Sequence, residues 1–229
     1  MGYEVIVIKE GYCFPEGEDF VRACGSITLL KGRHVIIVDT GNPRDKNLIL
    51  QGLSNNGLTP ENVDYVVCTH GHADRVGNLN LFSRAIHIVA YDICVGDQYL
   101  MHDFKEGIPY EIDEFVEVIA TPGRTGADVS VVVKKTPLGT VVLTGNLFEC
   151  CNDLDDPQLW QNSSDEPEVQ EQSRIKVLKV ADHIIPGHGP MFKVPVEYKK
   201  QMRVLMVCEI FTVSETGLAY HNFNIIDQI

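Results

Sequence analysis

The amino-acid sequence predicts a mixed α/β fold built as a single domain. Short runs of β-branched and aliphatic residues recur along the chain, and such runs indicate strands. Two stretches with helix start and stop signals lie between them. The chain has 229 residues, of which 44% are hydrophobic, so it is long enough to bury one substantial core.

The first half of the chain predicts five strands and one helix. The strands are expected at Val5 to Ile8, Ile27 to Leu30, Val35 to Val38, Tyr65 to Cys68 and Ile86 to Val89. Asn42 can cap a helix whose first residue is Pro43, a position where proline costs no hydrogen bond. This helix is expected to end near Gly57.

The second half predicts four more strands and a second helix. The strands are expected at Val116 to Ile119, Val129 to Val133, Thr140 to Leu143 and His183 to Ile185. The middle two would pair around the turn at residues 136–139. The helix is expected over Glu168 to Val180, and its candidate buried positions are Val169, Ile175, Leu178 and Val180.

A loop with metal-binding chemistry follows the strand Tyr65 to Cys68. Residues 69–78 read Thr-His-Gly-His-Ala-Asp-Arg-Val-Gly-Asn. His70 and His72 are two residues apart on a turn, so both imidazoles can face one ion, and Asp74 adds an anionic oxygen donor beside them. The loop therefore predicts a metal site.

Other segments supply residues for the same site. His188 lies in a Pro-Gly-His-Gly-Pro run after the strand His183 to Ile185, where a further imidazole ligand would sit. Asp39 ends the strand Val35 to Val38 and suits a carboxylate that orients ligands through hydrogen bonds. Two more short motifs lie between them, Thr-Pro-Gly at residues 121–123 and Thr-Gly-Asn at residues 144–146.

These motifs, in this order, resemble the metallo-β-lactamase superfamily over roughly residues 1–205. The resemblance implies an αββα sandwich with its pocket at one sheet edge, and it leaves residues 206–229 as a divergent C-terminal tail. Residues 128–133, 138–142 and 170–174 look like the small members near the glyoxalase II branch. Those are metal-dependent hydrolases described as endoribonucleases that cut the 3′ end of histone precursor mRNA. The resemblance thus implies two zinc ions and an RNA substrate.

The chain departs from this family pattern at three ligand positions. Arg75 and Arg124 stand where the family has histidines, and Asn146 stands where it has the aspartate that bridges the metals. The resemblance leaves four ligands, which are His70 and His72 for one metal and Asp74 and His188 for the other. It also makes Asp74 the candidate catalytic residue, with Asp39 behind the ligands.

The two arginines should oppose metal strongly. A guanidinium has no lone pair to donate. Its charge about 4 Å from a divalent ion costs roughly 8 kcal/mol at an effective dielectric constant of about 20. The binding free energy of a metal site with a micromolar dissociation constant is also about 8 kcal/mol. We therefore expect Arg75 and Arg124 to replace the cations and to pair with Asp74 and Asp39. The protein would then hold at most one zinc, weakly, and its activity would be weak or lost. Outward-pointing arginines would instead leave a hydrolase of phosphodiesters or thioesters with a single weakly held zinc.

The net charge of −13 argues against tight binding of RNA. Proteins that bind nucleic acids draw most of their affinity from lysine and arginine contacts to phosphate. Eight acidic residues and no lysine or arginine lie between Glu149 and Glu171. Such a run predicts a solvated loop, or a lid over the pocket that repels nucleic acid.

Composition also indicates the compartment. No N-terminal stretch combines basic residues with an apolar run, and no apolar run approaches a membrane span. The seven cysteines are odd in number and form no Cys-x-x-Cys pair, so we expect free thiols in the cytoplasm or the nucleus. A homodimer is left open.

Three functions remain open from the sequence. The first is a metallohydrolase that attacks phosphodiesters with a metal-activated water. The second is a metal-poor relative that binds small anions or a partner through Arg75, Arg124 and His188. The third is a glyoxalase-like thioester hydrolase, which needs the same metals as the first.

Overall fold

The computed structural model describes residues 2–199. Residues Met1–Val194 form one compact unit, and Pro195–Ile229 belong to a second. The predicted domain boundary near residue 205 and the predicted tail over residues 206–229 lie outside the described residues. The fold described below is that of the first unit.

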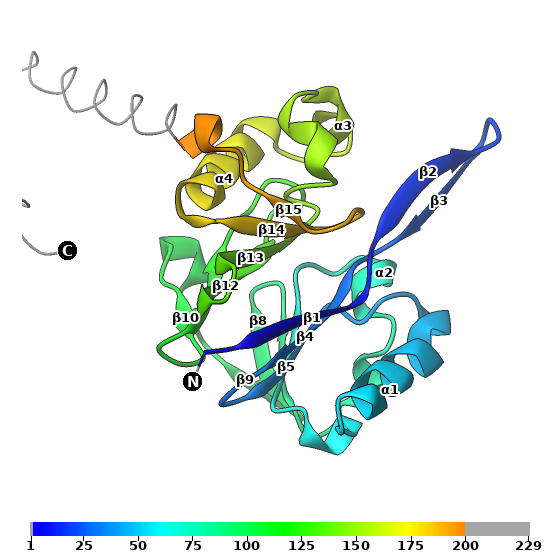
Figure 1. Ribbon diagram of the computed structural model, residues 1–229, viewed down its shortest axis with the longest axis vertical. Coiled ribbons are helices and arrows are strands. Elements are labelled where there is room, and N and C mark those ends of the chain that lie inside the picture. Colours follow the sequence, from blue (N-terminus) through cyan, green and yellow to red (C-terminus); the bar gives the residue numbers. More distant parts are fainter. Residues whose placement is uncertain (1, 200–229) are drawn as a thin grey trace, which may run out of the picture. The chain divides into compact units, whose positions relative to one another are not determined.

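Two sheets form the centre of this unit (Figure 1). The first sheet has the strand order β1-β4-β5-β6-β7-β8-β9. Its strands are β1 (Glu4–Lys9), β4 (Ile27–Lys31), β5 (Val35–Val38), β6 (Tyr65–Cys68), β7 (Ile86–Val89), β8 (Asp92–Val95) and β9 (Gln98–Leu100). β5, β6 and β7 run parallel, and the other neighbouring pairs are antiparallel.

The second sheet has the order β10-β11-β12-β13-β14-β15. Its strands are β10 (Tyr110–Glu111), β11 (Val116–Ala120), β12 (Val129–Thr136), β13 (Gly139–Gly145), β14 (His183–Pro186) and β15 (Phe192–Lys193). Only β13 and β14 pair in parallel within it. A separate hairpin of β2 (Tyr12–Glu16) and β3 (Phe20–Cys24) extends away from both sheets (Figure 1).

Short helices connect the strands. The α-helices are α1 (Lys46–Asn55), α2 (Ala73–Val76), α3 (Gln158–Gln161) and α4 (Pro167–Val180). The 3₁₀ turns are η1 (Pro43–Asp45), η2 (Pro60–Asn62), η3 (Leu79–Leu81), η4 (Phe104–Glu106) and η5 (Cys151–Leu154). Within residues 2–199, no helix is both long enough and apolar enough to cross a bilayer.

The core lies in layers because successive strand residues face opposite sides of a sheet. Val38 of β5 belongs to the cluster between the two sheets, where it joins Val131 and Leu143 of the second sheet. Its neighbour Ile37 faces the other side and packs with α1 through Leu53. α4 lies against the second sheet, where Lys176 donates to the carbonyl of Ala120 at the end of β11 (Figure 1). The predicted αββα sandwich is therefore confirmed.

All the predicted strands and both predicted helices are present, with bounds that differ by a few residues. The sequence reasoning missed the β2–β3 hairpin, the edge strands β9, β10 and β15, and β8, which pairs with β7 and β9. All of these strands are short.

The expected buried face of α4 was partly wrong. Val180 is 48% exposed, and Val169 and Ile175 are only partly buried. The helix instead buries Val177, Leu178 and several polar residues. The acidic run over residues 149–171 is not a plain solvated loop either, because it forms η5 and α3 and buries Trp160 and Asp153.

Candidate functional site

The residues singled out from the sequence meet where several strands end. Asp39 follows β5, and the loop with His70 and His72 follows β6. Asn146 follows β13, and His188 comes two residues after β14. Because β5 pairs in parallel with β6, and β13 with β14, their carboxyl ends share an edge and bring these side chains together.

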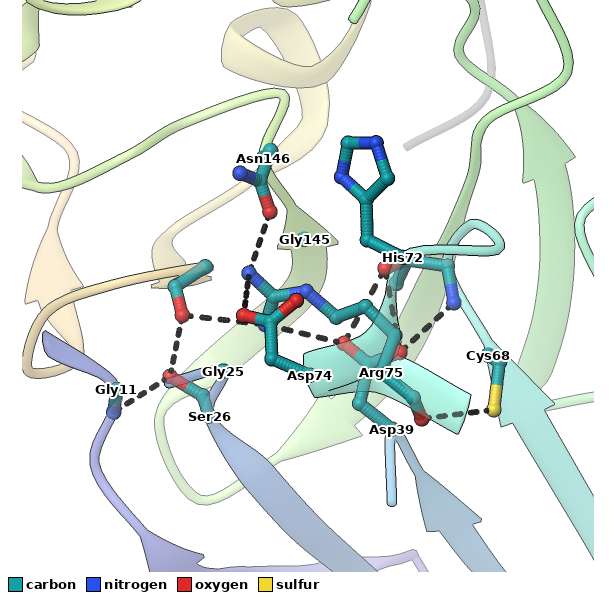
Figure 2. Close-up of polar contacts among 12 residues, drawn as sticks. Gly11, Gly25, Ser26, Asp39, Cys68, His72, Asp74, Arg75, Gly145 and Asn146 are labelled. Atoms are coloured by element: carbon teal, nitrogen blue, oxygen red, sulfur yellow. Dashed lines mark hydrogen bonds and ion pairs between the residues drawn. The ribbon is translucent and has the colours of Figure 1, made fainter. Parts of the chain in front are cut away.

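Arg75 occupies the centre of this edge. It lies in α2 and is 0% exposed, the largest fully buried side chain among the described residues. Its Nη1 donates to the carbonyl of Gly187 at 3.2 Å, and its Nη2 donates to the side-chain oxygen of Asn146 (Figure 2). Nη2 also lies 3.1 Å from Nε2 of His188. A guanidinium thus joins two of the positions where the family pattern would place ligands of the second metal.

Two glycines make room for this guanidinium. A Cβ atom on Gly25 would clash with Nη1 and Cζ of Arg75 and would lie 2.7 Å from the carbonyl oxygen of Asp74. A Cβ atom on Gly187 would lie 2.8 Å from Nη2 of Arg75 and 2.9 Å from the side-chain oxygen of Asn146. The backbone therefore closes on the arginine from two sides.

Two carboxylates balance the charge of Arg75. The Oδ2 atoms of Asp39 and Asp74 each lie 3.6 Å from a guanidinium nitrogen, which is an ion-pair distance but not a hydrogen bond. Burial raises the pKa of Asp39 to about 6, against the lowering effects of Arg75 and of hydrogen bonds from Thr69. The predicted pairing of Arg75 with these aspartates is therefore present, as ion pairs and not as hydrogen bonds.

His188 connects Asp74 to a second acid. Its Nε2 lies 3.1 Å from Asp74 Oδ2, and its Nδ1 makes a short hydrogen bond to Glu149. Burial acts to lower the pKa of His188, but the hydrogen bonds to Asp74 and Glu149 raise it overall. Burial acts to raise the pKa of Asp74, yet the hydrogen bond from His188 and the charge of Arg75 hold it well below its usual range. This network favours an ionised Asp74.

His70 and His72 face each other. The Nε2 atom of His70 is 2.9 Å from the Nδ1 atom of His72, and the two ring planes are 79° apart. Burial, followed by the charge of Arg75, lowers the pKa of His70 well below its usual value. The Nδ1 atom of His70 is 3.2 Å from the Thr69 hydroxyl and 3.8 Å from a carboxylate oxygen of Asp128. The nitrogens that would hold an ion are used in a hydrogen bond between the rings.

The residues present do not fit the two zinc ions that the superfamily pattern implies. Within residues 2–199, no group of three or more His, Cys, Asp or Glu side chains is arranged to hold a metal ion. The cause is visible in the donor set, since Nη2 of Arg75 lies 3.6 Å from Asp74 and 3.1 Å from His188, where the arginine contributes a fixed positive charge and no lone pair.

Arg124 faces an open pocket in front of this network. The pocket has a volume of about 430 Å³ and is lined by Cys13, Ala23, His72, Asp74, Arg124, Asn146, Glu149, Cys150, Leu159, Ser163 and His188. Nε of Arg124 is 4.0 Å from Glu149 and has no hydrogen-bond partner. We expected Arg124 to pair with Asp74 or Asp39, and this expectation was wrong. Arg124 approaches Glu149 instead.

The acidic segment forms the rim of the pocket through Leu159 and Ser163. It is anchored by Arg174 of α4, which makes two hydrogen bonds to the buried carboxylate of Asp153, at 2.9 and 3.1 Å. Cζ of the Arg174 guanidinium also lies over two aromatic rings, 4.0 Å from the ring centre of Phe148 and 4.7 Å from that of Trp160. This side of the pocket is thus fixed to the core.

The chain matches the model of the metallo-β-lactamase superfamily over residues 25–195. It belongs to that superfamily. It is 50% identical over 194 residues to metallo-β-lactamase domain-containing protein 1 of Xenopus laevis, covering 84% of this chain and 82% of the relative. Against the Homo sapiens protein of the same name, it is 43% identical over 222 residues, with 84% and 82% covered.

Solved structures of the superfamily share the fold. A putative metallo-β-lactamase from Thermotoga maritima gives a TM-score of 0.65 at 19% identity, covering 84% of this chain and 100% of that one. The mono-zinc form of the metallo-β-lactamase FIM-1 from Pseudomonas aeruginosa gives 0.60 at 15% identity, covering 91% and 96%. The predicted resemblance to this superfamily and to its domain-containing protein 1 is confirmed.

Sequence reasoning found most of the pocket but missed the roles of two acids. Asp128 begins one of the runs that resemble the superfamily branch and Glu149 begins the acidic run, but the sequence predicts no contact for either side chain. Glu149 binds His188 and Asn146, and Asp128 accepts from the backbone and hydroxyl of Thr125 beside His70. The metal roles of His70, His72, Asp74 and His188 stay predictions.

Proposed function

We propose that this chain is a metal-poor member of the superfamily, in which Arg75 takes the place of a metal ion and the pocket binds a small anion. Metal-dependent hydrolysis would then be weak or lost. The observation that carries this proposal is the complete burial of the Arg75 guanidinium between Asp39, Asp74, Asn146 and His188.

Electrostatics support the loss of metal. A divalent ion about 4 Å from this buried guanidinium would be opposed by roughly 8 kcal/mol at an effective dielectric constant of about 20. Asp39 and Asp74 cannot neutralise both cations, because their two negative charges are fewer than the three positive charges of Arg75 and a divalent ion together. Metal-activated water, which the superfamily's hydrolytic chemistry needs, would not form without the ion.

The ligand class follows from Arg124. Its Nε is buried and lacks a hydrogen-bond partner, and a buried donor without one costs free energy that an anion would recover. His72 lines the same pocket and adds a second donor. The volume of about 430 Å³ lies in the range of small-molecule sites. A carboxylate or a phosphate monoester would match the planar guanidinium.

This differs from the RNA cleavage that the resemblance implies for this branch of the superfamily. A polyanion would meet the eight acidic residues of the segment that forms the pocket rim, whereas a small anion can reach Arg124 alone. A hydrolase with one weakly held zinc at His70 and His72 is the alternative, and metal analysis separates the two.

The first test is the metal content. Purified protein exchanged into metal-free buffer should carry well under one zinc or manganese per chain, and zinc titration should give no tight binding. Generic phosphodiesters, thioesters and β-lactams should be hydrolysed near the background rate with added zinc. One weakly bound zinc per chain with zinc-dependent hydrolysis would favour the alternative hydrolase, and two bound metals per chain would refute the proposal.

The second test is anion binding. Inorganic phosphate and succinate are titrated calorimetrically into the wild type, into Arg124→Met and into Arg33→Met. Arg33 is an exposed arginine outside the pocket, so its removal controls for general charge. Binding should be lost in Arg124→Met and kept in Arg33→Met. Equal affinity in all three proteins would contradict a site at Arg124.

A further inference from the structure

Three side chains outside the pocket network lie in unusually close contact at the base of the β2–β3 hairpin. Lys9 is the last residue of β1, Cys24 the last residue of β3, and Asp45 the last residue of η1. Nζ of Lys9 lies 2.8 Å from Sγ of Cys24 and 2.7 Å from Oδ1 of Asp45. Sγ of Cys24 lies 3.2 Å from Oδ2 of Asp45, so the same carboxylate contacts both groups.

The nitrogen–sulfur separation is the informative distance. A hydrogen bond from nitrogen to oxygen spans about 2.7 to 3.2 Å, and sulfur is a larger atom than oxygen. A contact of 2.8 Å to sulfur is therefore too close for an ordinary hydrogen bond. A direct S–N bond is shorter than the ~2.05 Å of a disulfide, so it would require a further approach of at least about 0.7 Å. One oxygen atom bonded to both ends fits the gap with little movement.

We propose that Lys9 and Cys24 form an oxidative modification site, in which peroxide joins Nζ to Sγ through a single oxygen atom. One hydrogen peroxide converts the thiol to a sulfenic acid and releases water. A second peroxide converts the neutral amine to a hydroxylamine and releases another water. The sulfenic acid and the hydroxylamine then condense with loss of a third water, leaving the S–O–N bridge.

Asp45 positions both reacting groups, since its carboxylate contacts Nζ of Lys9 and Sγ of Cys24. The Lys9 ammonium must lose a proton to solvent before its nitrogen can be oxidised; burial acts to lower the pKa of Lys9, but the hydrogen bonds to Asp45 and Cys24 raise it overall, so peroxide reacts with the less populated neutral amine. Cys24 is fully buried, whereas the side chains of Lys9 and Asp45 remain 16% and 13% exposed. A small oxidant can therefore approach along the lysine, while large thiols are kept from the sulfur.

The bridge would link this site to the wall of the pocket. Cys24 directly precedes Gly25, whose backbone closes on Arg75. Ala23 and Cys13, on the paired strands β3 and β2, line the pocket itself. A covalent bond from β1 to the end of β3 would hold the hairpin base in place. It would also remove the ion pair between Lys9 and Asp45.

Peptide mapping of the full-length protein tests the proposal. Wild-type protein is treated with hydrogen peroxide, alkylated, digested with trypsin and analysed by mass spectrometry. We expect no cleavage after Lys9 and a cross-link between residues 1–22 and residues 23–31, with one oxygen gained and two hydrogens lost. Lys9→Met and Cys24→Ser should both abolish this product.

Cys13→Ser is the matched control for a disulfide between Cys13 and Cys24, because Cys13 lies on the strand paired with β3, opposite Ala23 and so on the other face of the hairpin from Cys24. A disulfide would gain no oxygen, would leave cleavage after Lys9 intact and would vanish in Cys13→Ser. The proposed bridge should persist in that variant. Wild-type protein in which oxidised Cys24 carries only sulfinic or sulfonic acid, with Lys9 unmodified, would overturn the proposal even if a variant failed to fold.

Discussion

Arg75 should contribute more to stability than any surface arginine, and Arg75→Met tests this directly. The substitution keeps an unbranched side chain of similar length but removes the buried charge. Asp39 and Asp74 each lie 3.6 Å from the guanidinium, and each attraction is worth about 4 to 5 kcal/mol at an effective dielectric constant of about 20. Burying the arginine costs several kcal/mol in lost hydration, which offsets part of this sum. The net loss of unfolding free energy should be about 3 to 5 kcal/mol.

Urea denaturation followed by tryptophan fluorescence provides the assay. Trp160 is the only tryptophan of the chain and is 4% exposed, so its emission reports unfolding. Arg22→Met is the control, because the Arg22–Glu16 pair lies on the exposed hairpin, and its midpoint should not change. If Arg75→Met proves to be unfolded, the triple variant with Asp39→Asn and Asp74→Asn should fold, since it no longer strands two carboxylates.

The reasoning would be refuted by a loss below about 1 kcal/mol in Arg75→Met, the range of a solvated pair. It would also be refuted if the triple variant were less stable than Arg75→Met alone. Either result would mean that the buried aspartates do not depend on the guanidinium.

Three other predictions follow from the same geometry. Asp74→Ala removes a carboxylate that pairs with Arg75 and His188 and should cost about 3 to 5 kcal/mol by denaturation, whereas a change under 1 kcal/mol rejects a buried pair. Arg75→His, Arg124→His and Asn146→Asp together should restore tight zinc binding in a calorimetric titration, and single reversions should do much less because one arginine still opposes the ion. A triple variant that binds zinc no better than wild type would mean that the backbone around the pocket no longer has the geometry of a metal site, and it would contradict the prediction. Burial raises the pKa of Asp128 from 3.8 to about 6, so the folded state binds the proton of this carboxyl more tightly than the unfolded state does. The free energy of unfolding of the wild type therefore falls as the pH rises from 3.8 to about 6. Asp128→Asn should therefore gain on the order of 1 to 3 kcal/mol relative to wild type between about pH 4 and pH 7, and a pH-independent difference would contradict the assignment.

The sequence alone determined the fold family and most of the residues that lie at the pocket. Strand periodicity and the order of short motifs around His70, His72, Asp74 and His188 predict the sandwich, because each motif follows a strand whose register places it at one edge. The sequence also showed that Arg75, Arg124 and Asn146 replace metal ligands, and that the two arginines cannot bind a metal, since a guanidinium stays charged and has no lone pair to donate.

Only the tertiary structure decided where the arginines point. Arg75 is enclosed by Gly25, which lies fifty residues earlier in the chain, and by Gly187, more than a hundred residues later, so no local pattern could reveal its burial. Arg124 has the same chemistry but lines the open pocket beside Glu149, which the sequence does not indicate. The contact between Lys9 and Cys24 likewise joins two strands that carry no sequence signal for each other. These contacts depend on packing between residues that are far apart in the chain, whereas strand periodicity and side-chain chemistry depend only on the local sequence.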